Sequence, residues 1–320
     1  MTAKTAKTAT FKAKADQPDV YARVTAAILA ALEAGTRPWM PPWNAARAAG
    51  PISRPSRHDG TPYRGVNVLL LWLAATESGY AAPHWMTYRQ AQALGGQVRQ
   101  GERGSLVVYA NAIKRTETNE KTGEDEEIEI PYMKGYTVFN AEQIDGLPDR
   151  YRATVAAPVL SDAGRSARLD AFFAATGADV RHGGDRAYYD PDADRIQMPP
   201  FAAFRDPESF YGTLAHECVH WAGHSSRLAR DFGAKSWGDA GYAMEELVAE
   251  IGSAFLCATL GIAPEVREDH AAYIDCWVRV LAGDQRAIFA AAGHAQKAAD
   301  RLLATAESRA VPEEPERRAA

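Results

Sequence analysis

The segment from Asp206 to Gly223 constrains the fold of this chain more than any other stretch of it. Asp206 suits the position that caps a helix, Pro207 suits the first turn, and Gly223 suits the end, so the segment predicts one α-helix. Residues four apart on a helix lie about 6 Å apart along its axis and on the same face. His216 and His220 have this spacing, so their imidazole rings can converge on one metal ion.

Glu217 completes the pattern HExxH in this segment, and that pattern is typical of zinc-dependent hydrolases. On the helix Glu217 stands about 100° round from His216, where its carboxylate can accept a proton from water beside the metal. We interpret Glu217 as the catalytic base, and His216 and His220 as metal ligands. Zn²⁺ is the expected ion, and another divalent ion such as Mn²⁺ is possible. The alternative interpretation is a helix that has the HExxH motif but binds no metal.

Two histidines do not complete a catalytic zinc site, which takes three protein ligands and a water. In the longer pattern HExxHxxGxxH the third ligand falls three residues after Gly223, where this chain has Ser226. His224 could reach the metal only if the chain unwinds at Gly223. A histidine at the surface of the helix end is therefore the simpler interpretation of His224.

A second predicted helix, near residues 242–260, supplies carboxylates instead. Glu246 and Glu250 are four residues apart in an apolar run, so they share one face, and buried carboxylates need partners. We predict that Glu246 is the third ligand and that Glu250 accepts a hydrogen bond from the far nitrogen of a liganding histidine. Glu245 faces elsewhere, and we interpret it as a surface charge near the start of this helix.

Charge is divided unevenly along the chain. Residues 1–114 carry 14 Lys and Arg against 6 Asp and Glu, whereas the remainder carries 22 against 35, for a net charge of −5. A basic first part favours binding to a polyanion, although solvated surface charge can produce the same split. With 320 residues, of which 46% are hydrophobic, the length favours two domains.

Neither a membrane span nor a secretory signal is predicted, because the chain has no apolar run of about 18 residues and no apolar segment after its basic start. We therefore expect no membrane association and a cytoplasmic protein. Cys218, Cys257 and Cys276 form no CxxC pair and fall in apolar helical patterns, so buried reduced thiols are expected.

Hydrophobic periodicity and breaker residues predict an α+β fold. The predicted segments are a flexible basic arm (1–16), an α+β domain (17–148), a linker (149–158), a mainly helical domain with a small sheet (159–307) and a disordered tail (308–320). In the first domain we expect helices near 20–34, 64–79 and 85–96, and paired strands near 105–114 and 127–140. In the second we expect short strands at 179–182 and 195–198 and helices near 161–176, 207–223, 242–260, 270–281 and 284–306.

Aromatic and basic residues alternate in the first domain, between residues 37 and 103. The candidates for nucleic-acid binding are Trp39, Trp43, Tyr63, Arg64, Trp85, Tyr88, Arg89, Arg99 and Arg103. Unpaired bases stack on aromatic rings while basic side chains follow the phosphates, so this mixture favours a single-stranded nucleic acid. Packing in the core is an equally good interpretation of Trp39 and Trp43, and the helical spacing of Trp72 predicts a core residue.

The N-terminal part resembles the single-stranded DNA-binding domain of ArdC-type antirestriction proteins. The segments that carry this resemblance are DVYARVTAAILAALEAGTRPWMPPW, YRGVNVLLLW, GYAAPHWMTYRQAQALGGQVRQGERGSLVVYA and KGYTVFNAEQIDGLP. The C-terminal part is similar to the zincin-like metallopeptidase domain of the same proteins, which some plasmid primase-type proteins share. The segments here are AYYDPDADRIQMPP, TLAHECVHWAGHSSRLAR and YAMEELVAEIGSAFLCATLGI, so the resemblance extends from Asp19 to about Leu303.

This resemblance implies a protein of a plasmid or mobile element that binds incoming single-stranded DNA and protects it from restriction endonucleases. It also implies a metal held by His216, His220 and a glutamate of EELVAE. Three readings of the function remain open. In the first, the chain is an antirestriction protein whose metal domain is structural or of unknown activity. In the second, the metal domain is an active zinc protease that cuts DNA-bound or host regulatory proteins. In the third, the chain is an accessory protein of plasmid replication or conjugation.

Overall fold

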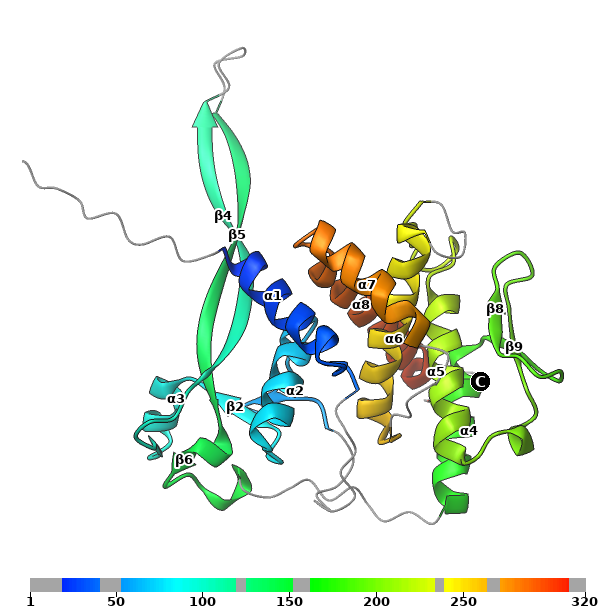
Figure 1. Cartoon of the computed structure of the whole chain (residues 1–320), viewed down its shortest axis with the longest axis horizontal. Coiled ribbons are helices and arrows are strands. Elements are labelled where there is room, and N and C mark those ends of the chain that lie inside the picture. The colour runs from blue at the N-terminus through cyan, green and yellow to red at the C-terminus, as the bar shows by residue number, and fades with distance from the viewer. Residues whose placement is uncertain are drawn as a thin grey trace, which may run out of the picture.

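Elements from the two halves of the chain pack side by side in the computed structural model of the protein (Figure 1). The structure describes residues 19–40, 53–118, 125–151, 162–233, 239–263 and 271–310. The predicted basic arm, Trp43 and most of the predicted linker lie outside these ranges.

The N-terminal half combines helices with strands, as predicted, and its strands form a small mixed sheet. Its elements are α1 (Val20–Glu33), β1 (Ser56–Arg57), α2 (Val66–Ser78), β2 (His84–Met86), α3 (Tyr88–Ala93), β3 (Gln97–Val98), β4 (Ser105–Thr118), β5 (Asp125–Asn140), η2 (Ala141–Gln143), β6 (Ile144–Asp145) and η3 (Asp149–Tyr151). The main sheet has the order β1-β2-β5-β4, and β3 pairs with β6. Helix α2 is buried around most of its surface and ends at Gly79, whose φ of 73° a glycine adopts without strain.

Strands β4 and β5 form a long antiparallel hairpin that projects away from the rest of the molecule (Figure 1). Its base packs on α2, where the Asn67 side chain bonds both the N–H and the C=O of Val108, at 2.7 and 2.8 Å. The predicted helix at 85–96 is shorter than expected, because Trp85 and Met86 pair with β5 instead. Helix α3 starts only after Thr87, whose side chain caps it in a capping box.

The C-terminal half is mainly helical and carries a small sheet. Its elements are α4 (Asp162–Thr176), β7 (Asp179–His182), β8 (Tyr188–Asp190), β9 (Arg195–Met198), η4 (Phe201–Ala203), α5 (Pro207–Ala222), α6 (Ala240–Leu260), α7 (Ala271–Gly283) and α8 (Ala287–Ala310). The two predicted strands pair in parallel as β7 and β9, and β8 joins them in the order β7-β9-β8. Helix α8 continues through Ala310, past the position where the disordered tail was expected to begin.

Helices α5 and α6 approach closely because α6 has a glycine at their contact. A Cβ at Gly252 would lie 2.9 Å from both Cγ atoms of Val219, so a larger residue would push the helices apart. Both helices are largely buried. Since α5 carries the two histidines and α6 carries the glutamates, this contact sets the distance between the predicted metal ligands.

The two halves share one apolar core. Trp39, just after α1, is fully buried with its ring edge-on to that of Trp277 on α7, at a centroid distance of 5.5 Å. Trp72 on α2 meets Phe255 on α6 in the same way, at 5.9 Å, and its predicted place in the core is confirmed. The N-terminal half therefore supports the helices that carry the predicted site. Among the described helices, none is both long and apolar enough to cross a membrane.

Candidate metal centre

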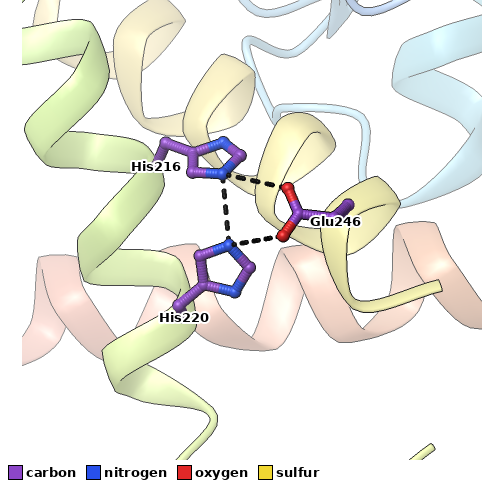
Figure 2. A group of neighbouring side chains, drawn as sticks. All are labelled: His216, His220 and Glu246. Atoms are coloured by element: carbon purple, nitrogen blue, oxygen red, sulfur yellow. Dashed lines mark hydrogen bonds and ion pairs between the residues drawn. The ribbon is translucent and has the colours of Figure 1, made fainter. Parts of the chain in front are cut away.

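Helix α5 places its two histidines as the spacing predicts. The Asp206 side chain caps the helix by accepting from the N–H of Ser209 at 2.8 Å, and Gly223 ends it. Both imidazole rings point from α5 toward α6 (Figure 2), and the Nε2 atoms of His216 and His220 are 3.1 Å apart.

Glu246 on α6 faces the two rings. Its carboxylate oxygens lie 3.5 Å from Nε2 of His216 and 3.6 Å from Nε2 of His220 (Figure 2). Within the described ranges, these residues are the one group of His, Cys, Asp or Glu whose potential ligand atoms converge this closely, all within 4.8 Å of one another. The predicted third ligand is therefore brought into place by the packing of α6 on α5.

The outer nitrogen of each histidine faces a different carboxylate. Nδ1 of His220 is 2.9 Å from Oε1 of Glu245, and Nδ1 of His216 is 3.2 Å from Oε1 of Glu250. A proton held on Nδ1 toward a carboxylate leaves the lone pair on Nε2. Two such lone pairs at 3.1 Å repel each other unless a cation lies between them. The donor set of two imidazoles and one carboxylate thus fits a divalent metal.

The interpretation of Glu245 as a surface charge is wrong. Its side chain is only 16% exposed, and besides His220 it binds the guanidinium of Arg230. Helical periodicity gave no signal for this contact, because Arg230 lies in the segment after α5 and reaches α6 only through the tertiary fold. Glu250 stands near His216, in the place expected for it.

The carboxylates around the site are held in their charged form. Burial acts to raise the pKa of Glu245, but hydrogen bonds from Arg230 and His220 outweigh it and hold this pKa well below its usual range. Burial also acts to raise the pKa of Glu246, yet the proximity of His216 and His220 lowers it to about 2. Both carboxylates are therefore available to neutralise a cation at neutral pH.

The hydroxyl of Tyr242, which the sequence reasoning missed, also donates to the Glu246 carboxylate. The spacing of four residues between Tyr242 and Glu246 on one helix is the signal that could have found it. Its oxygen lies 3.1 Å from that of Tyr273 on α7, which stacks on Trp277 at the interface between the two halves. A chain of contacts therefore runs from Glu246 through Tyr242, Tyr273 and Trp277 to Trp39 in the N-terminal half.

Glu217 and His224 occupy different environments. Glu217 is almost completely buried and directly follows His216 on α5. Nδ1 of His224 is 2.8 Å from the hydroxyl of Ser226 in the turn after the helix, as expected for a histidine outside the site. The thiols of Cys218 and Cys257 are free and buried as predicted, whereas that of Cys276 is only partly buried.

Three of the aromatic residues assigned to nucleic-acid binding are core residues, which corrects their assignment. Trp39 packs on Trp277, Trp85 packs edge-on to Tyr80, and Tyr63 is covered on one side by the guanidinium of Arg57. Buried rings have no free face for a base. The spacing of Trp39 did not reveal this, because the ring that covers it, Trp277, lies in a distant segment of the chain.

The remaining candidates lie at the surface. Tyr88, Arg89 and Arg103 are exposed, and no structural observation assigns them a partner nucleic acid. Arg64 is exposed but pairs with Asp300 on α8, and Arg99 pairs with Glu102 and Asp145. These two arginines therefore already have acidic partners within the protein.

Two exposed tyrosines on the β4–β5 hairpin were missed. Tyr109 and Tyr136 are 45% and 43% exposed, and their rings meet edge to face at a centroid distance of 6.3 Å. Lys134, which is also exposed, stands opposite Tyr109 in the register of the hairpin. The signal in the sequence was the pairing of two aromatic strands, but only the register shows that both rings share one face.

Comparison with known proteins decides the family. The family model of a zincin-like metallopeptidase matches residues 167–294, and that of the N-terminal domain of the anti-restriction factor ArdC matches residues 18–139. The metal-free crystal structure of the antirestriction ArdC protein from the R388 plasmid has a TM-score of 0.76 to this chain at 50% sequence identity, covering 91% of this chain and 98% of that one. The chain belongs to the ArdC family.

Further relatives of this ArdC family member match most of this chain, but they differ in their own length. The Mn(II)-bound structure of the R388 protein has a TM-score of 0.73 at 49% identity, covering 90% of this chain and 98% of that one. Protein y4eC of Sinorhizobium fredii is 46% identical over 286 residues, which is 88% of this chain and 91% of that protein. DNA primase TraC of Escherichia coli is 39% identical over 298 residues, 89% of this chain but only 27% of TraC. The expected α+β fold with two ArdC-type domains is confirmed.

Binding of a divalent metal is expected to stabilise this ArdC family member through His216. At a free Mn²⁺ or Zn²⁺ concentration of 100 times the dissociation constant, the free energy of unfolding should rise by about 2.7 kcal/mol. Thermal denaturation with metal and with EDTA measures this effect. The stabilisation should vanish in His216→Ala and persist in His224→Ala, a histidine two turns away that lies outside the site. Equal stabilisation of both variants would contradict the assignment.

Proposed function

We propose that this protein binds the single-stranded DNA of an incoming mobile element, protects it from restriction, and carries a metal-dependent peptidase in its C-terminal half. The observation that carries the proposal is the convergence of Nε2 of His216, Nε2 of His220 and the Glu246 carboxylate. The buried Glu217 directly follows His216 on the same helix. The antirestriction role is proposed from membership of the ArdC family.

The residues around the site have the chemistry that hydrolysis of a peptide bond requires. His216, His220 and Glu246 would hold the metal, which when bound lowers the pKa of water and polarises a carbonyl group. Glu217 would take the proton of the attacking water, since it directly follows His216 on α5. Glu245 and Glu250 would keep the two imidazoles in the tautomer that leaves Nε2 free. The proposed substrate is a protein that is bound to the DNA.

The β4–β5 hairpin offers a surface for unpaired bases. Tyr109 and Tyr136 expose their rings on one face of the hairpin, and the Tyr109 hydroxyl accepts a hydrogen bond from Asn111 at 2.9 Å, which restricts its rotation. Lys134 adds a positive charge next to them. An aromatic pair with an adjacent cation is the arrangement that binds single strands without regard to sequence.

Removing both tyrosines is expected to weaken binding to single-stranded DNA. Each base stacked on an aromatic ring contributes about 1–3 kcal/mol, so Tyr109→Ala with Tyr136→Ala should raise the dissociation constant for a labelled oligo-dT by at least about tenfold. Fluorescence anisotropy at one fixed salt concentration measures this change, since phosphate contacts depend on salt. Tyr188→Ala is the matched control, because Tyr188 is 48% exposed but lies on the small sheet of the other half. Unchanged affinity in the double variant would rule out this surface.

Similarity to TraC supports a second candidate, an accessory role in plasmid replication or conjugation. The chain matches about a quarter of TraC, so the likeness concerns a part of that protein and not its whole activity. The two candidates differ in one measurement. An accessory of replication or transfer should be needed in recipient cells that lack restriction endonucleases, whereas an antirestriction protein should be dispensable there.

A further inference from the structure

Arg230 is buried in the segment between α5 and α6, eight residues after the end of the helix that carries His216 and His220. Its side chain is only 1% exposed. Its Nε donates to Oε2 of Glu245 at 2.7 Å, and its Nη2 donates both to Oε1 of Glu245 and to the carbonyl of Val219, the latter at 2.9 Å. The guanidinium therefore grips both oxygens of one carboxylate and one carbonyl of α5. This fork fixes the position of Glu245 relative to the helix that carries His220.

Stability alone does not account for this buried ion pair. Removing a guanidinium from water is costly, and apolar residues of similar volume are often at least as stable in its place. The pair is also incompletely satisfied, since the buried Nη1 of Arg230 has no hydrogen-bond acceptor in the described part of the chain. A buried ion pair that is costly to stability in this way indicates a functional role for Arg230 and Glu245.

The loop is shaped around the guanidinium. Ala229, just before Arg230, has a φ of 46°, a left-handed conformation that a residue other than glycine adopts only under strain. The N–H of Arg230 returns to the carbonyl of Gly223 at 2.9 Å. A Cβ at Gly223 would lie 2.6 Å from Nη2 of Arg230, so the glycine that ends α5 also makes room for this side chain.

We propose that Arg230 and Glu245 are positioning residues that hold the His220 ring in its metal-binding orientation and thereby set the affinity of the site for a divalent metal. The inference rests on the metal centre of the proposed function. Because Arg230 fixes both oxygens of Glu245, Oε1 has a defined direction in which to accept from Nδ1 of His220, at 2.9 Å. The His220 ring then keeps its proton on Nδ1, and its Nε2 lone pair points at Glu246 and His216.

The test measures Mn²⁺ binding to the full-length protein and not its activity. The two methods are isothermal titration calorimetry and electron paramagnetic resonance of Mn²⁺. In Glu245→Gln one acceptor oxygen remains for three donors, Nε and Nη2 of Arg230 and Nδ1 of His220. Loss of a partner behind a metal-binding histidine lowers metal affinity by about 10- to 100-fold, and we expect this change in Glu245→Gln and in Arg230→Met. The double variant should be no weaker than either single variant, because both remove the same contact.

Arg227→Met is the matched control. Arg227 lies in the same loop and also binds a carboxylate, that of Asp194, but it stacks on Trp221 and has no contact with a metal-binding histidine. Its replacement should leave Mn²⁺ affinity within about twofold of the wild type. Circular dichroism spectra establish that each variant is folded at the temperature of the titration, and Glu245→Gln decides the matter if Arg230→Met does not fold.

The outcomes separate the two levels of the proposal. Wild-type protein that does not bind Mn²⁺ would contradict the proposed metal centre itself. Wild-type protein that binds Mn²⁺ through His216, together with an unchanged affinity in Glu245→Gln, would overturn the positioning role and leave the metal centre standing. Equal losses in Arg230→Met and Arg227→Met would also overturn it, since a general loosening of the loop would then explain the effect.

Discussion

Replacement of Glu217 with glutamine is expected to slow peptide-bond hydrolysis by about 10²- to 10⁴-fold, the usual contribution of a general base. The change keeps the size of the side chain and leaves His216, His220 and Glu246 in place, so Mn²⁺ or Zn²⁺ binding should persist. Cleavage of fluorescein-labelled casein with metal and oligo-dT present measures the first effect, and calorimetric titration measures the second. Glu208→Gln is the control, because Glu208 is in the first turn of the same helix and away from the ligands.

This variant also separates antirestriction by binding from antirestriction by cleavage. If protection of transferred DNA from a restriction endonuclease survives Glu217→Gln, the proposed DNA binding is sufficient for protection. If protection disappears while single-stranded DNA binding is retained, proteolysis is part of the mechanism. Hydrolysis of casein at the wild-type rate by Glu217→Gln would contradict the assignment of the base.

Replacement of Trp39 with alanine is expected to lower the free energy of unfolding by about 3–5 kcal/mol. Trp39 is fully buried between α1 and α7 and packs on Trp277, so its removal leaves a large cavity in the core that joins the two halves. The melting temperature should fall by on the order of 10 °C. Chemical denaturation, monitored by circular dichroism, measures the loss in free energy of unfolding.

The same variant tests whether Trp39 binds DNA. Below its melting temperature Trp39→Ala should bind oligo-dT as tightly as the wild type, since the ring has no free face. Tyr88→Ala provides the comparison, because an exposed tyrosine of the same half should change stability by less than about 0.5 kcal/mol. A Trp39→Ala protein of normal stability that has lost DNA binding would restore the interpretation drawn from the sequence.

Elements with strong local signals were predicted within a few residues. Helix α5 begins after its Asp206 cap and ends at Gly223, and β7 and β9 have the predicted bounds. Helix α3 was misplaced by three residues, because the pairing of Trp85 with Asn140 on β5 took the start of the expected helix into the sheet. Local propensity could not show this pairing, since its partner lies more than 50 residues along the chain.

The aromatic residues illustrate a different limit. Trp39 lies far along the chain from Trp277, which covers it, so the composition around Trp39 resembled that of a base-binding surface. Tyr109 and Tyr136 lie in strands, where alternation allows either face to be buried, and the position of α2 decides which stretch of the hairpin is covered. Whether the ring of Tyr109 or Tyr136 is exposed therefore depends on the assembled fold and not on the neighbouring residues in the sequence.

The sequence by itself determined that His216 and His220 share a face of one capped helix, that Glu217 lies between them, and that a second helix brings glutamates. These features follow from 3.6 residues per turn and from the chemistry of helix ends, which act over a few residues. Only the tertiary structure decided which glutamate contacts which nitrogen atom of the two histidines. The close contact of α5 with α6 at Gly252 lets Glu246 face His216 and His220, and Arg230 in the segment after α5 binds Glu245, which contacts His220. The rotation of one helix against another and the path of a loop depend on side chains far apart in the chain, so no local pattern encodes them.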